Sequence, residues 1–332
     1  MPLLPECARS QNEVYDLIFK GKYMTRAFFI LLLNMTFLFA QNINDWQSIT
    51  DLNDVEDIAV SGNAVWAVSD GGMFRYSLQD SSFEKFTNLQ GLRSLSLNAI
   101  VSDDQGRIIV GGEKGLIQIY NPADGSWDYN YALEGKPVYN LFLKGDTLWA
   151  ATRDGAGVFK RTQGAFVFKD FFHNFPLRPE KILQCTVFNG KIWLGTDKGL
   201  LAAPSDFGRF PINDPQRWQA FTTAQNLPDN QITALVHDAD FLWIGTKFGL
   251  ASVDRQNNIQ LRTDWKLLNN GKYLYVDYLF PLDGRLYVAA GISLYTYEPQ
   301  KGITGGMVFK ANIRSIAVDS TKTFWVGQQQ KG

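Results

Sequence analysis

The stretch WQAFTTAQNLPDNQITALVHDADFLWIGTKFGLASVD, residues 218–254, decides the fold of this chain. It contains four short runs of β-forming residues, and turns rich in Pro, Asn, Asp and Gly separate them. The runs are Trp218–Thr222, Ile232–Val236, Leu242–Thr246 and Gly249–Val253, each close to the usual length of a strand. No helical spacing of apolar residues competes with this pattern. The stretch therefore predicts one four-stranded unit.

The unit recurs along the chain. Seven times a bulky residue opens a short strand that runs into a glycine-containing turn, at positions spaced by 43, 40, 44, 50, 44 and 38 residues. A repeat of this length that is rich in β-formers is typical of a propeller. We therefore predict an all-β fold, a seven-bladed β-propeller of four-stranded blades over residues 41–332. The repeated segments are Trp66–Gly72, Ile109–Gly115, Trp149–Gly155, Trp193–Gly199, Trp243–Gly249, Tyr287–Gly291 and Trp325–Gly332.

Sorting the strands by their place in a blade predicts how the ring closes. There are seven innermost and seven second strands, but only six third strands. The segment Trp46–Thr50, WQSIT, matches Trp218–Thr222 and supplies a seventh outermost strand. We expect this N-terminal strand to complete the last blade and close the ring, which leaves no open sheet edge. The last blade then lacks one strand, so the sequence reads as truncated just after Gly332.

The N-terminal region has the features of an export signal. Residues 27–39, AFFILLLNMTFLF, follow three basic residues and precede the small residue Ala40. We predict a signal peptide over residues 24–40 that is cleaved between Ala40 and Gln41, and an over-extended start over residues 1–23. An N-terminal anchor helix is the alternative, but the apolar run is shorter than the roughly 20 residues that a membrane span needs.

Composition and motifs favour binding over catalysis. The formal charge of −1 gives no reason to expect a nucleic-acid partner. Cys185, in a strand-like run, is predicted to be a buried small hydrophobe. His173 and His237 lie far apart without the ligand spacing of a zinc site. No nucleophile elbow or phosphate loop is recognisable. We therefore expect no enzyme, no metal and no cofactor.

The stretch from Leu227 to Leu250 resembles the two-component regulator propeller repeat family. It carries the Leu-Pro-x-Asn-x-Ile, Leu-Trp-Ile-Gly-Thr and Gly-Leu pattern of that repeat, and residues Ile192–Leu200 carry its second half again. The resemblance implies an exported, non-enzymatic binding or scaffold propeller in the periplasm or on the cell surface of a Gram-negative bacterium.

Two contexts use such propellers. The favoured one is a type IX secretion surface-attachment complex, because the signal leads almost directly into a tryptophan-containing strand. The alternative is the periplasmic oligosaccharide-sensing propeller of a hybrid two-component receptor. The resemblance accordingly implies either protein partners of a surface or periplasmic complex, or a glycan or lipopolysaccharide ligand.

The turns between second and third strands are candidates for a ligand or partner face, because their side chains vary while the frame repeats. Solvated turns are the simpler alternative. The candidates are Arg153, Asp154, Asp197, Lys198, Lys247 and Phe248.

Two groups of aromatic residues receive different interpretations. The tryptophans that open the second strands are predicted to pack between blades, since aromatic rings bury a large area. The loop DFFHNFPLRPEK, residues 170–181, instead places aromatics in a polar region. Phe171, Phe172 and Phe175 are therefore predicted to form an exposed patch for a protein partner.

Overall fold

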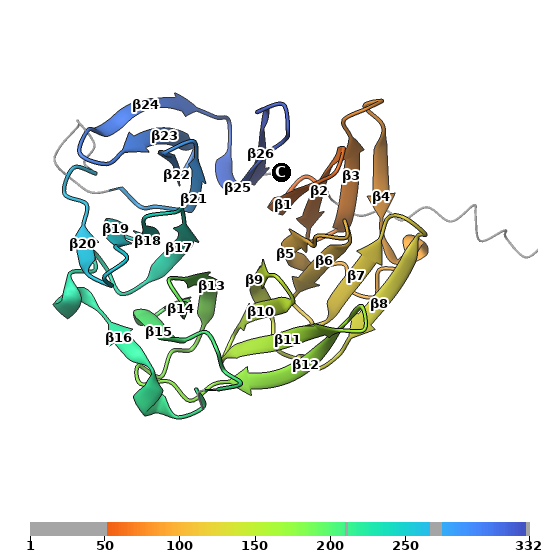
Figure 1. Ribbon diagram of the computed structural model, residues 1–332. Helices are drawn as coiled ribbons and strands as arrows, with labels where there is room; N and C mark the ends of the chain where they lie inside the picture. Colours follow the sequence, from red (N-terminus) through yellow and green to blue (C-terminus); the bar gives the residue numbers. More distant parts are fainter. Residues whose placement is uncertain (1–51, 210–211, 266–273, 330–332) are drawn as a thin grey trace, which may run out of the picture. The chain divides into compact units, whose positions relative to one another are not determined.

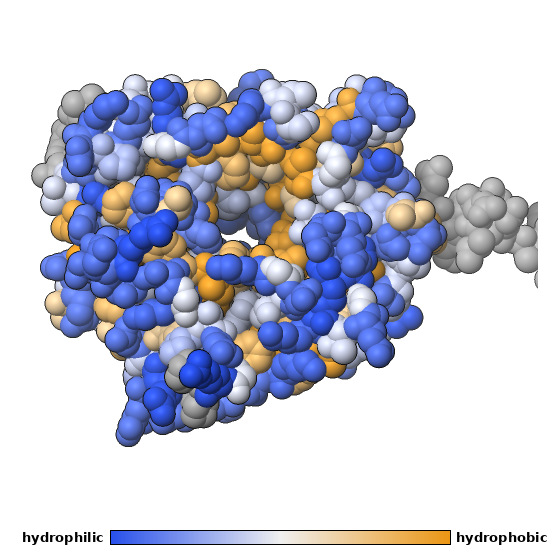
Figure 2. All heavy atoms as spheres, viewed as in Figure 1, coloured by the Kyte–Doolittle hydropathy of each residue, from blue (hydrophilic) through white to orange (hydrophobic). Residues whose placement is uncertain are grey.

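The computed structural model describes residues 52–209, 212–265 and 274–329. These residues belong to one structural unit, residues 49–332. They form a ring of small antiparallel sheets around a central opening (Figures 1 and 2). The regular elements of the described residues are β-strands and three short 3-10 turns, and none of these residues forms a helix able to cross a membrane.

Six of the sheets are four-stranded blades, in which the strands follow one another from the centre outward in chain order (Figure 1). Blade one is β1 (Val55–Ser61), β2 (Ala64–Ser69), β3 (Gly72–Ser77) and β4 (Phe83–Phe86). Blade two is β5 (Leu97–Ser102), β6 (Ile108–Gly112), β7 (Ile117–Asn121) and β8 (Ser126–Asn130). Blade three is β9 (Val138–Lys144), β10 (Thr147–Thr152), β11 (Ala156–Thr162) and β12 (Ala165–Phe172).

The remaining three blades follow the same plan. Blade four is β13 (Ile182–Phe188), β14 (Lys191–Thr196), β15 (Leu200–Pro204) and β16 (Gln219–Phe221). Blade five is β17 (Ile232–His237), β18 (Leu242–Thr246), β19 (Gly249–Val253) and β20 (Ile259–Leu261). Blade six is β21 (Tyr278–Leu282), β22 (Arg285–Ala290), β23 (Ser293–Glu298) and β24 (Gly302–Val308).

The prediction of seven four-stranded blades is wrong. The seventh repeat forms only a hairpin of β25 (Asn312–Val318) and β26 (Phe324–Gln329), which contacts β21 on one side and β1 on the other (Figure 1). The described residues therefore contain six blades and one two-stranded sheet. The error arose because strand-like patterns show which residues favour β-structure, whereas sheet membership depends on pairing with distant segments. The predicted closing strand Trp46–Thr50 and the predicted signal peptide lie outside the described residues.

Neighbouring sheets approach most closely where a small residue on a second strand meets an apolar residue on the next inner strand. A Cβ atom added to Gly245 of β18 would lie 2.5 Å from Cγ1 of Val276. A Cβ atom added to Gly195 of β14 would lie 2.7 Å from Cγ2 of Ile232. Gly327 of the hairpin would contact Cγ1 of Val55 in blade one at 2.8 Å, so the hairpin packs on blade one as the blades pack on one another.

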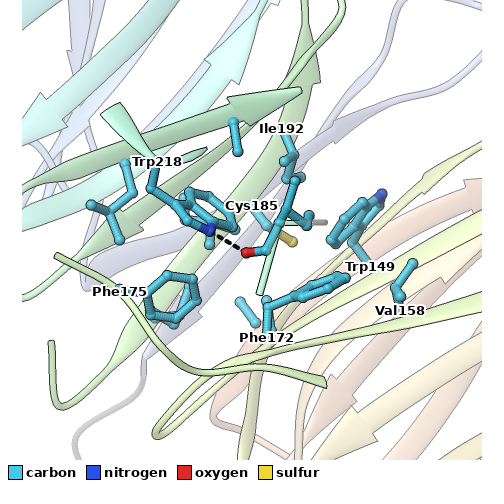
Figure 3. Packing of buried hydrophobic residues seen from close by; sticks show 14 of the residues in the cluster. Trp149, Val158, Phe172, Phe175, Cys185, Ile192 and Trp218 are labelled. Carbon is cyan, nitrogen blue, oxygen red and sulfur yellow. Dashed lines mark hydrogen bonds between the residues drawn. The ribbon is translucent and has the colours of Figure 1, made fainter. Parts of the chain in front are cut away.

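Aromatic residues fill the spaces between the blades. The tryptophans of β2, β10, β14 and β18 are all buried, as predicted, whereas Trp325 of β26 is half-buried, with its ring 5.3 Å from that of Tyr76 in blade one. Figure 3 shows one such cluster, in which Trp149, Phe172 and Trp218 surround Cys185. Trp218 donates a hydrogen bond from Nε1 to the Ile212 carbonyl over 2.6 Å. Cys185 is a buried free thiol, as predicted, and its burial raises its pKa to about 12.

The close approach at Gly245 yields a stability prediction. Gly245→Ala should lower the free energy of unfolding by about 1–3 kcal/mol, because the new methyl group overlaps Val276 and the blades must move apart. Gly305→Ala, on the outer strand β24, is the matched control, since its Cβ would lie 3.8 Å from Thr296 in ordinary contact. Urea unfolding followed by tryptophan fluorescence measures both, and equal losses would show that inter-blade spacing is not the constraint.

Candidate functional site at the mouth of the central channel

The centre of the ring holds a cavity of about 640 Å³ that is lined by residues from all seven inner strands or their leading segments. The space-filling view shows the molecule hollowed at this place (Figure 2). Its lining mixes carboxylates, amides, hydroxyls and aromatic rings with aliphatic side chains. A concave site with several convergent polar groups is the usual form of a binding site. We therefore take this cavity as the candidate functional site.

A repeated irregularity of the backbone builds one end of the cavity. Six inner strands carry a β-bulge at their beginning, and each bulge leaves one extra residue without a partner on the second strand. Bulges redirect a side chain from its regular alternation. Asp277 occupies the corresponding place just before β21, after the buried Val276. We call these seven cavity-lining residues the mouth ring: Glu56, Asn98, Tyr139, Leu183, Thr233, Asp277 and Arg314.

Two members of the mouth ring hold adjacent blades together. Asn98 donates from Nδ2 to the Val138 carbonyl of blade three over 3.0 Å, and to Oε1 of Glu113 over the same distance. Thr233 donates from its hydroxyl to the Val276 carbonyl. The bonds to the Val138 and Val276 carbonyls each join a bulge residue to an apolar residue at the start of the next blade. These two side chains therefore have a structural part in the mouth.

The charged members of the mouth ring lie on three neighbouring sheets. Burial raises the pKa of Glu56, and the nearby Arg314 opposes this shift. Burial also raises the pKa of Asp277, which accepts a hydrogen bond from the Gly291 amide over 2.5 Å. Arg314 donates to the Gln329 side chain over 2.9 Å. Among the described residues, no basic nitrogen lies within ion-pair distance, 4.0 Å, of the Glu56 or the Asp277 carboxylate.

Beside the mouth ring, Asp57 connects three inner strands. Its Oδ1 accepts a hydrogen bond from the Ser315 hydroxyl of β25 over 2.7 Å, and its Oδ2 accepts one from the Ile100 amide of β5 over 3.1 Å. Burial raises the pKa of this carboxyl to about 6. The same geometry recurs where Asn140 accepts a hydrogen bond from the Cys185 amide of the next blade. Asp57 thus joins the hairpin to blades one and two.

The turn residues predicted as a ligand face lie at the same end of the ring as the mouth. The end of each second strand pairs with the start of its inner strand, as Thr196 pairs with Ile182. Three of the six candidates are bound to nearby residues of this protein. Asp154 forms an ion pair with Lys136 over 3.0 Å. Asp197 accepts from the Glu180 and Lys181 amides, and Lys198 donates to the Arg178 carbonyl.

The other three candidates, Arg153, Lys247 and Phe248, are exposed, and Phe248 is 55% exposed although its side chain is a large hydrophobic ring. Their part in ligand binding stays a prediction. Two turns of the same end, each from a different blade, thus present exposed side chains beside the mouth.

The prediction that the loop at residues 170–181 exposes three phenylalanines is wrong for two of them. Phe172 and Phe175 are 2% and 3% exposed and belong to the cluster around Cys185 (Figure 3). Phe171 is half-buried, and the Lys136 ammonium lies 4.5 Å from the centre of its ring. Phe172 ends the outer strand β12 and Phe175 follows it in the loop, and both rings pack into the cluster between blades three and four.

Sequence reasoning missed the mouth ring. The sequence holds only a weak signal, an apolar residue at or near the start of each inner strand whose successor varies in chemistry, as in Val55-Glu56, Val276-Asp277 and Ile313-Arg314. The bulge that turns this successor into the channel is not visible in the sequence. Among the described residues, no group of three or more His, Cys, Asp or Glu side chains is arranged to hold a metal ion.

Comparison with known proteins shows the fold. No protein-family model and no curated protein sequence matches the chain. One similar solved structure is PorZ, an essential bacterial surface component of the type IX secretion system of Porphyromonas gingivalis, with a TM-score of 0.66 and 17% identity over 85% of this chain and 36% of that one. Another is the extracellular domain of the putative hybrid two-component system BT3049 from B. thetaiotaomicron, with a TM-score of 0.65 and 19% identity over 84% of this chain and 39% of that one.

A third similar structure is the WD40 β-propeller domain of Doa1, with a TM-score of 0.64 and 15% identity over 85% of this chain and 93% of that one. The chain thus spans well under half the length of the first two structures. At these identities the likeness establishes the propeller fold, and two of the three similar structures are of a bacterial surface component and of the extracellular domain of a putative hybrid two-component system.

Asp57 yields a prediction about the pH dependence of stability. Its folded-state pKa of about 6 exceeds its ordinary value, so the folded state holds the proton more tightly than the unfolded chain. The stability of the wild type relative to Asp57→Asn should therefore fall between about pH 4 and pH 7, by about 2–3 kcal/mol. Urea unfolding across this range measures the difference.

Asp128→Asn, on the exposed face of β8, is the control and should change the pH profile little. Parallel profiles for wild type and Asp57→Asn would show that the Asp57 carboxyl does not titrate differently in the folded state.

Proposed function

We propose that this chain is an exported, non-enzymatic binding or scaffold propeller that acts in a type IX secretion surface-attachment complex. The observation that supports this proposal is the mouth ring. The seven mouth-ring residues present side chains of different chemistry at corresponding places around one cavity. A varied set of side chains on a constant, well-packed frame suits recognition of a partner.

The similarity to PorZ supports the secretion context, because that protein is a surface component of such a system. The signal-like N-terminal segment supports export of this chain. The proposed partners are proteins of the surface complex, and the proposed location is the periplasm or the cell surface of a Gram-negative bacterium.

A second candidate function is favoured by the likeness to the extracellular domain of BT3049. In this function the propeller senses an oligosaccharide for a hybrid two-component receptor. The exposed Arg153 and Lys247 would then contribute to the ligand face. Glycan-array binding that is lost in Arg153→Ala and Lys247→Ala would favour the sensor, whereas no binding to any glycan would count against it.

Export can be tested at the predicted cleavage site. Expressed in a Gram-negative host, the exported protein should begin at Gln41, because a signal peptidase needs a small residue just before the cut. Ala40→Leu should leave the precursor uncleaved, whereas Ala40→Ser should be cleaved as the wild type is. Mass spectrometry of the N-terminal peptide in periplasmic and surface fractions measures both. An intact precursor of the wild type confined to the cytoplasm would contradict the proposal.

The secretion role can be tested by deleting the gene in the source bacterium. We expect secreted proteins to lose their attachment to the cell surface, and expression of the wild-type chain should restore it. Surface proteomics of intact cells measures this attachment. Normal attachment combined with a lost transcriptional response to a glycan would instead favour the receptor.

A further inference from the structure

The charges that line the channel cavity are unbalanced. Four carboxylates line it, those of Glu56, Asp57, Glu113 and Asp277, whereas Arg314 is the only basic residue among the described residues of the lining. The cavity wall therefore carries an excess of negative charge when its carboxyl groups are ionised. A low-dielectric wall with charges of one sign attracts ligands of the opposite sign.

Elsewhere in this fold, a deeply buried carboxylate has a basic partner. The side chain of Asp103 is fully buried, and Arg107 and Arg161 lie 2.8 Å and 3.5 Å from its Oδ2. This pairing offsets the cost of removing a charge from water. Glu56, Asp57 and Asp277 are half-buried, yet none of them has an ion-pair partner among the described residues. The one arginine of the lining offsets only part of this negative charge. A ligand that carries a positive charge would offset the rest and lower the cost of placing these charges in a half-buried site.

The single cation of the mouth acts on both carboxylates only in part, because its charge lowers the pKa of Glu56 and of Asp277 while the larger effect of burial raises both. Arg314 stands between Asp277 and Glu56 in ring order, because β25 lies between β21 and β1 (Figure 1). Its guanidinium donates to the Gln329 amide and forms an ion pair with neither carboxylate. Three tyrosines, Tyr139, Tyr275 and Tyr278, also line the cavity, and Tyr275 lies close enough to Asp277 and Arg314 for their charges to affect its pKa. Aromatic rings add to the attraction for a cation when it lies over their faces.

We infer that the channel mouth binds a basic side chain, an ammonium or guanidinium group, presented by a partner polypeptide. The inference rests on the proposed function in so far as the partner is a protein. A cavity of about 640 Å³ accommodates a long basic side chain together with part of its flanking backbone. The Glu56 and Asp277 carboxylates accept hydrogen bonds from the ligand, and Arg314 opposes its binding by charge repulsion.

Three probe peptides test this inference by isothermal titration against the full-length protein. Their central residue is lysine, Nε-acetyl-lysine or glutamate, and the flanking residues are glycine. The lysine peptide should bind at least tenfold more tightly than the other two, and added salt should weaken its binding. Equal binding of the lysine and acetyl-lysine peptides, or no binding of any, would overturn the inference.

Variants of the mouth give a second test with an informative sign. Glu56→Gln and Asp277→Asn should each weaken binding of the lysine peptide severalfold, whereas Arg314→Gln should strengthen it. A site for an anion would show the opposite response to Arg314→Gln. Asp128→Asn, on the outer strand β8, is the matched control and should leave binding unchanged. Thermal melting of each variant verifies that it is folded.

Spermidine distinguishes the source of the cation. If free spermidine binds more tightly than the lysine peptide, the ligand is a small polyamine and the polypeptide partner is overturned. The test is separable from the secretion test above. Restored surface attachment without lysine-peptide binding would overturn this inference alone, whereas lysine-peptide binding without any attachment defect would overturn the secretion role alone.

Discussion

The contact between a small residue on one second strand and an apolar residue on the next inner strand is the constraint on which this structure depends. At Gly195 and Gly245, no side chain larger than hydrogen fits without displacing the neighbouring blade. This close approach sets the spacing of the inner strands and hence the width of the channel. The large tryptophans can then fill the wider space farther out, where the blades diverge. Small residues near the axis and large ones outside it are two consequences of the same radial geometry.

The same geometry explains how the mouth is built. The inner strands converge on the channel, and a regular strand would direct alternate side chains toward the flat faces of its sheet. A bulge breaks this alternation on six of the seven inner strands and turns the extra residue inward, and on blade six Asp277 takes the corresponding place just before β21. Each bulge also interrupts the ladder of backbone hydrogen bonds between the start of an inner strand and the second strand. Asn98 and Thr233 compensate with hydrogen bonds to the next blade, so the disruption becomes a link between sheets.

The sequence predicts the all-β class, the repeat and most of the strands, because alternation and turn chemistry are local properties. The inner, second and third strands of blades four and five lie where the pattern around Trp193 and Trp243 places them. The blade count failed at the seventh repeat, since Trp325 marks a strand but cannot reveal what pairs with it. The prediction for Phe172 and Phe175 is wrong because polar neighbours suggest exposure, whereas packing between blades three and four buries both rings. The mouth ring depends on bulges, which leave no clear local signature.

The mouth-ring residues fall into two groups, those that hydrogen-bond to a neighbouring blade and those that do not. Asn98 and Thr233 are engaged with backbone carbonyls of the next blade, so their side chains are committed to the frame. Glu56, Asp277 and Arg314 are not bound in this way to a neighbouring blade, and they adjoin the two-stranded sheet. That sheet has the fewest strands to hold it. A ligand that contacts these three residues would therefore join blade six, the hairpin and blade one. Because a ligand stabilises the conformation that binds it, occupancy of the mouth and integrity of the ring at this place are coupled.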